Sequence, residues 1–131
     1  MPVWIVAAVA GLLLFAIPAD ARAQSLECAT SRKLVGECFT VHGRMTSCTS
    51  VPSVRIWIVG THRVLGVADA QGDVAGDEVL SGTLNREMFA LPPCSKAAWG
   101  DFTVCPLTPS RPGVMQRVCL VDAKKLLFKE W

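Results

Sequence analysis

The chain has 131 residues, of which 51% are hydrophobic and 18% are charged, and its formal net charge at pH 7 is +2. This small charge argues against a nucleic-acid-binding protein, because such proteins concentrate basic residues on one face, and here basic residues are adjacent only at 32–33 and 124–125. Residues 24–131 have the commonest size of one domain, and we expect a single one.

The N-terminal residues 1–23 are predicted to be a secretory signal peptide. An uncharged apolar run at 3–17 is followed by Pro18 and by small residues. We place cleavage after Ala23, with Ala21 as the alternative. The run is shorter than the roughly 20 residues of a membrane-spanning helix. We therefore expect export to the periplasm or the medium, with no membrane segment after cleavage.

Three strands are predicted between residues 38 and 68. Residues 38–45 and 54–59 alternate between apolar and polar side chains, which is the period of a half-buried strand. A turn at 60–61 leads directly into a third strand at 62–68. The side chains expected to face the core are Phe39, Val41, Met45, Val54, Ile56 and Ile58.

The segments around these strands carry weaker signals. Residues 24–36 are expected to be a lead-in tied down by Cys28. Residues 71–82 are rich in glycine and acids but do not fit the EF-hand spacing, so we expect an acidic loop and no calcium site. Residues 83–90 suit a short helix, and 87–91 a strand, and the sequence does not decide between them.

The last third of the chain is predicted to be mostly strand. Residues 100–105 alternate clearly, and 106–113 form a proline-rich connection that cannot be a central strand. Residues 114–122 are the next strand. Residues 123–131 are either a final strand or one helical turn leading into it.

Six cysteines lie in the exported part, and an even number in a small secreted chain indicates three disulfides. Zinc ligands usually lie two to four residues apart, and no two of these cysteines are that close. A hairpin turning at 111–113 would place Cys105 opposite Cys119, so we expect that pair. The simplest remaining pairs are Cys28 with Cys38 and Cys48 with Cys94.

Short strands separated by glycine and proline, with at most one helix, predict a mainly β fold. We expect a disulfide-stabilised antiparallel β-sandwich, immunoglobulin-like or transthyretin-like, or a small barrel.

Three segments carry a resemblance: CFTVHGR, PSVRIWIVGTHRVLGV and GDFTVCPLTPSRPG. They resemble a group of small exported proteins of proteobacteria with no assigned activity. The order of the opening strands is also similar to that of transthyretin-like and carboxypeptidase-regulatory-like sandwiches. Neither resemblance implies catalytic residues, and a sandwich fold alone does not imply a function.

The outward face of the first two strands is the candidate binding site. It is expected to carry His42, Arg44, Arg55 and Trp57. Tryptophan and arginine are enriched where proteins bind partners. In the alternative interpretation, loops or the C-terminal segment cover Trp57, and the arginine stems pack over it.

The sequence contains no G-x-S-x-G turn and no C-x-x-C pair, and we expect no cofactor and no metal. We predict a monomeric, exported, non-catalytic binding or accessory module with a protein or glycan partner and no nucleic-acid partner. One alternative is a small hydrolase or metal-dependent protein that uses His42 and His62. Another is a secreted protease inhibitor that presents the loop 106–113.

Overall fold

The computed structural model describes residues 11, 25–74 and 79–130. The predicted signal peptide, apart from residue 11, and the segment 75–78 of the acidic loop lie outside the described residues. Within the described part, no helix combines the length and apolar character needed to cross a membrane.

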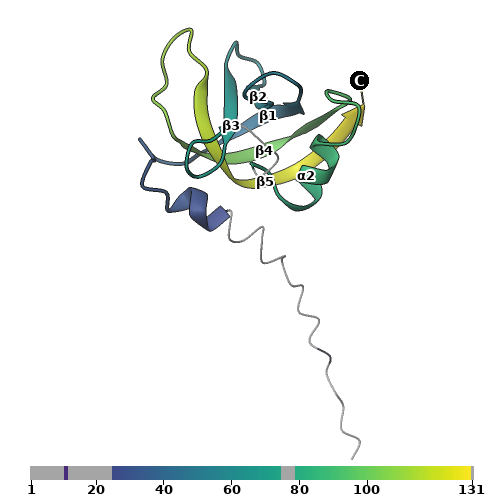
Figure 1. Cartoon of the computed structure of the whole chain (residues 1–131), viewed down its shortest axis with the longest axis horizontal. Coiled ribbons are helices and arrows are strands. Elements are labelled where there is room, and N and C mark those ends of the chain that lie inside the picture. Colours follow the sequence, from purple (N-terminus) through teal and green to yellow (C-terminus); the bar gives the residue numbers. More distant parts are fainter. Residues whose placement is uncertain (1–10, 12–24, 75–78, 131) are drawn as a thin grey trace, which may run out of the picture.

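The domain is mainly β, as the sequence predicts, with the short helix α2 between the third and fourth strands and a helical turn at residues 25–29 before the first strand (Figure 1). The elements are β1 (Phe39–Ser47), β2 (Val54–Ile58), β3 (Val64–Ala68), α2 (Gly82–Met88), β4 (Lys96–Pro106) and β5 (Gln116–Glu130).

The sheet closes on itself in the order β1-β2-β3-β5-β4, because β1 pairs with both β2 and β4. All neighbouring strands are antiparallel except β3 and β5, which run parallel. The expectation of a purely antiparallel sheet is therefore wrong. The chain crosses through α2 and β4 before β5 returns beside β3, and a parallel pair needs such a crossover.

The alternating patterns place the apolar side chains inside, as predicted for β1 and β2. Met45, Val54 and Ile56 are fully buried, and Ile58 packs against the same core. The later strands and β3 complete the core with Leu65, Val67, Ala98, Phe102, Val104 and Val118.

The sequence allowed either a helix at 83–90 or a strand at 87–91, and the structure has the helix, α2. Leu84 and Met88 lie four residues apart, on one side of the helix, and both are buried in the core. A helix this short is not stable alone in water, so its packing against the barrel holds it in place.

An ion pair connects α2 to the start of β4. Lys96 Nζ lies 2.8 Å from Glu87 Oε2. The pKa of Lys96 is raised above its ordinary value of 10.5, chiefly by the hydrogen bond to Glu87 and then by the charge of that carboxylate. The pair therefore stabilises the folded state fully below about pH 10.5, and this contribution is lost as the pH rises through the raised pKa.

We expect Glu87→Gln to lower the free energy of unfolding at about pH 8, and to lower it less at a second pH above 10.5, where Lys96 begins to lose its proton. Urea unfolding of both proteins at the two pH values measures this difference. An equal effect of the substitution at both values would show that the ion pair does not stabilise the docking of α2.

The disulfides are Cys28–Cys119, Cys38–Cys105 and Cys48–Cys94. Of the expected pairs, Cys48–Cys94 is present, whereas Cys105–Cys119 and Cys28–Cys38 are wrong. Cys105 and Cys119 do lie opposite each other in the β4–β5 ladder, but each is bonded to a cysteine from the N-terminal side of β1.

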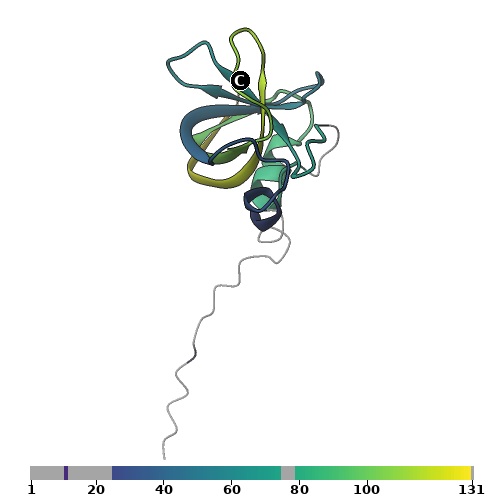
Figure 2. The same cartoon turned by 90° about the vertical axis from the view of Figure 1, so that its left-hand side faces the viewer.

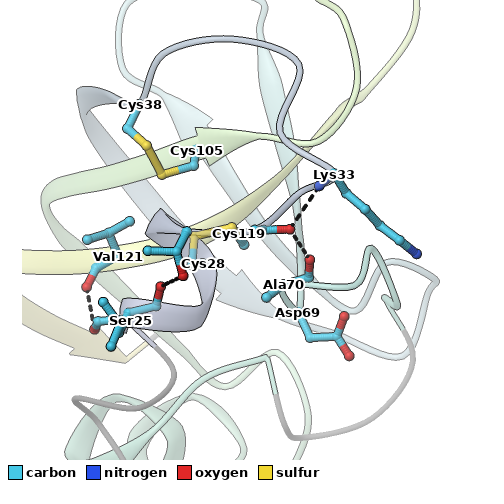
Figure 3. The surroundings of a disulfide bond; sticks show 12 residues. Ser25, Cys28, Lys33, Cys38, Asp69, Ala70, Cys105, Cys119 and Val121 are labelled. Carbon is cyan, nitrogen blue, oxygen red and sulfur yellow. Dashed lines mark hydrogen bonds between the residues drawn. A yellow bond between two sulfur atoms is a disulfide. The ribbon is translucent and has the colours of Figure 1, made fainter.

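Two features explain these pairs. The β1–β4 ladder pairs Phe39 with Val104, which brings Cys38 to Cys105. The segment 25–35 lies against the outer side of β4 and β5, where Ser25 donates a hydrogen bond to the Val121 carbonyl (Figure 3). Cys105 and Cys119 are consequently buried although they point away from the barrel core.

Candidate binding face

A row of outward side chains crosses all five strands. Arg44 on β1 is the direct cross-strand partner of Trp57 on β2 and of Trp99 on β4. Trp57 is in turn paired with Val64 on β3, and Trp99 with Leu127 on β5. Cross-strand partners share one face of a sheet. We call these five residues the aromatic belt.

The centre of the belt is a stack of one arginine and two indoles. The Arg44 guanidinium carbon lies 5.1 Å from the ring centroid of Trp57 and 5.7 Å from that of Trp99. The two rings meet edge to face at a centroid distance of 6.2 Å. The Trp57 indole N–H donates a 2.7 Å hydrogen bond to the Thr61 carbonyl. Cation–π contacts and this hydrogen bond fix the orientation of the rings.

The four predicted binding residues lie on this outer surface in different settings. Arg44 and Trp57 are in contact at the centre of the belt. Arg55 lies one row further along β2, where its Nε donates to the Pro52 carbonyl. His42 lies on the other side of Arg44, and its Nδ1 is 3.0 Å from Asp101 Oδ1. Trp57 is half-buried, in contact with Arg44 and Trp99.

Sequence reasoning missed Trp99 and Leu127. The predicted fourth strand began at Gly100, one residue after Trp99, although the inward alternation of Phe102, Gly100 and Ala98 continues toward the N-terminus. Leu127 was assigned to an undecided C-terminal segment. It is 53% exposed and therefore extends the belt as an accessible apolar surface.

A groove continues the belt beyond β3. It is lined by the β2–β3 turn and by the loop between β4 and β5, and Val64 belongs to both the belt and the groove. Figure 1 and Figure 2 show both segments projecting from the same side of the barrel, away from α2. The lining residues are His62, Arg63, Val64, Ser110, Arg111, Pro112, Gly113, Val114 and Met115.

The arginines of the groove differ in their surroundings. Arg63 Nη2 donates a hydrogen bond to Oε1 of the buried Gln116, whose Nε2 donates to the Thr108 carbonyl. Arg111 is exposed at the tip of the loop, next to the turn at Gly113, which has a positive φ of 75°. One arginine is thus held in position, and the other can move toward a ligand.

Two stretches that build much of this surface contain no acidic residue, although Asp101 lies on it beside His42. None occurs between Glu37 and Asp69, or between Asp101 and Asp122, and these stretches also contain no lysine. These stretches have arginine but no acid and no lysine, which can be read from the sequence and could have indicated the site. The arginines within the two stretches are Arg44, Arg55, Arg63, Arg111 and Arg117.

The two histidines do not form a metal site with other ligands in the part of the chain that is described. There, the one group of three side chains of metal-binding type is Cys28, Cys105 and Cys119, all of which are in disulfides. His62 lines the groove, whereas His42 is paired with Asp101.

The chain matches no protein-family model, no curated protein and no solved structure. The functional inference therefore depends on the belt and the groove themselves.

Proposed function

We propose that this domain is an exported, non-catalytic binding module whose ligand lies across the aromatic belt. The observation that carries the proposal is the Arg44 guanidinium placed between Trp57 and Trp99 on three adjacent strands. Buried or half-buried tryptophan and arginine side chains dominate the binding energy of many interfaces. The side chains of the belt offer stacking and one positive charge, but no group that transfers protons near neutral pH.

The strand order supports a finer proposal about the fold. A closed five-stranded barrel with the order 1-2-3-5-4 and a helix between the third and fourth strands is the arrangement of the OB-fold. OB-folds bind oligonucleotides and oligosaccharides over strands 2 and 3, between two loops. Fold similarity alone is only an analogy for function.

This barrel differs from that arrangement at Gly66 on β3. A Cβ atom at Gly66 would lie 2.7 Å from Pro52 Cγ and 3.0 Å from Met115 Sδ, so the two loops already close over this position. The usual ligand surface is therefore partly occupied by the protein itself. This supports a binding surface centred on the belt, one row away.

The three disulfides fit a secreted or extracellular protein. They support placing the module in the periplasm or the medium, where its ligand would be a component of the envelope or of the surroundings. We also propose that the domain acts as a monomer.

We expect Trp57→Ala and Trp99→Ala each to weaken ligand binding by about tenfold or more, because truncating a central aromatic anchor typically costs over 1 kcal/mol. An array of envelope glycans and peptides, probed with the oxidised domain, identifies ligands, and calorimetry then gives the dissociation constants. Leu91→Ala is the matched control, because Leu91 is 84% exposed and lies outside the belt.

Circular dichroism must first show that each variant is folded. If Trp57→Ala does not fold, Leu127→Ser tests the same surface from β5, where the side chain is largely exposed. Folded belt variants that bind as tightly as the wild type would refute the proposed site.

A further inference from the structure

The belt and the groove form one continuous path across the barrel. The belt curves around the closed barrel, and the part of it from Trp99 to Val64 covers four neighbouring strands, about 14 Å along the surface at the usual strand spacing. Val64 then leads into the groove beside Arg63 and Arg111. A path of this length suits an extended chain that runs across the strands.

The charges at the groove end of the path are of one kind, whereas Asp101 lies two residues after Trp99 at the β4 end. The basic groups of the two acid-free stretches are arginines and the two histidines, without lysine. A guanidinium is planar and binds carboxylates through two parallel hydrogen bonds, which an ammonium group cannot do. It also carries five N–H donors, so the bond from Arg63 to Gln116 orients this side chain without using up its capacity.

The belt requires a ligand with flat apolar surfaces as well as negative charge. Sugar rings stack on indoles through their C–H faces, and uronate sugars add a carboxylate on the same ring. Single-stranded nucleic acid also offers stacking, but it carries a phosphate at every nucleotide and is bound by surfaces of concentrated positive charge. A formal net charge of +2 and a disulfide-bonded domain favour the glycan.

We infer that this path binds a linear uronate-containing glycan, with sugar rings on the aromatic belt and a carboxylate bound by Arg63 and Arg111 in the groove. The inference depends on the proposed binding function and names the class of its ligand.

The test compares oligogalacturonate with the same oligomer after complete methyl esterification, which keeps the rings and linkages but removes the charge. We expect the acid form to bind at least tenfold more tightly than the ester, with an affinity that falls as salt is added. Arg111→Ala and Arg63→Lys should each weaken binding of the acid form about tenfold and weaken binding of the ester much less, because the ester offers no charge to the guanidinium. Arg86→Ala on α2 is the matched control, because it removes an exposed arginine far from the groove.

Each contrary result has a defined meaning. Equal binding of acid and ester, lost in Trp57→Ala, would overturn the carboxylate site while leaving the binding module intact. Tighter binding of oligothymidylate than of oligogalacturonate would overturn it in favour of nucleic acid. If neither oligogalacturonate nor oligoalginate binds, the uronate inference is wrong. The array of envelope glycans and peptides, probed with the wild type and with Trp57→Ala, then tests the binding module separately.

Discussion

Replacing both Cys28 and Cys119 by alanine is expected to destabilise the domain by about 2–5 kcal/mol, which is a large part of the stability of a domain this small. The bond joins residues separated by 91 positions, the longest separation of the three, so its loss releases the most conformational freedom in the unfolded chain. It also attaches the segment 25–35 to the outer side of β5 (Figure 3). Alanine avoids placing a hydroxyl at two buried positions.

The matched variant replaces Cys48 and Cys94, whose bond spans 46 positions. Halving the loop reduces the entropic contribution by about 0.6 kcal/mol, so this variant should lose slightly less stability. Urea unfolding under non-reducing conditions gives both values. Peptide mapping of the wild type should recover Cys28 linked to Cys119, and a peptide linking Cys105 to Cys119 would contradict the structure.

The local parts of the fold could be predicted because alternation is a property of neighbouring residues. It identified β1 and β2 and the buried side of each, including Met45 and Ile56. It could not show that β1 pairs with β4 or that β3 runs parallel to β5, because nothing in a strand's own sequence names its distant partner. The wrong disulfide pairs follow from that gap, since Cys38 reaches Cys105 only through the β1–β4 ladder.

Strand β5 was split in two for a physical reason. The predicted strand ends at residue 122 and leaves 123–131 as either a strand or a helical turn, whereas β5 runs from Gln116 to Glu130. In the structure Lys125 has a positive φ of 56°, and the β4–β5 register shifts between Trp99 and Asp101, so a bulge interrupts the pattern within one continuous strand. Bulges depend on the partner strand and leave only a weak trace in sequence.

The sequence predicted those residues of the candidate site that lie on strands it also predicted. Arg44 and Trp57 were placed on one face because both positions follow from local alternation. Trp99 and Leu127 were missed because they join the belt only through the pairings of β4 with β1 and with β5. The acid-free composition of the surrounding segments could have indicated the charged surface but not its geometry.

Gly100→Ala is expected to cost about 3 kcal/mol of stability, because this glycine lies where the bulge brings β5 unusually close to β4. An added Cβ would lie 2.7 Å from the Lys124 carbonyl oxygen and 2.9 Å from Leu126 Cδ2. The carbonyl belongs to the backbone of a paired strand and cannot move aside without disturbing the ladder. Urea unfolding measures the loss.

Gly36→Ala is the control, because its nearest contact would be Pro106 Cγ at an ordinary 3.5 Å. It should change stability by no more than about 0.5 kcal/mol. A Gly100→Ala protein as stable as the wild type would show that the bulge tolerates a side chain. If the variant folds with a shifted bulge, Trp99 no longer lies opposite Leu127, so ligand binding by the belt should weaken although Gly100 is not part of the belt. Stability and binding would then fall together, because the bulge that closes β4 against β5 also aligns the binding face.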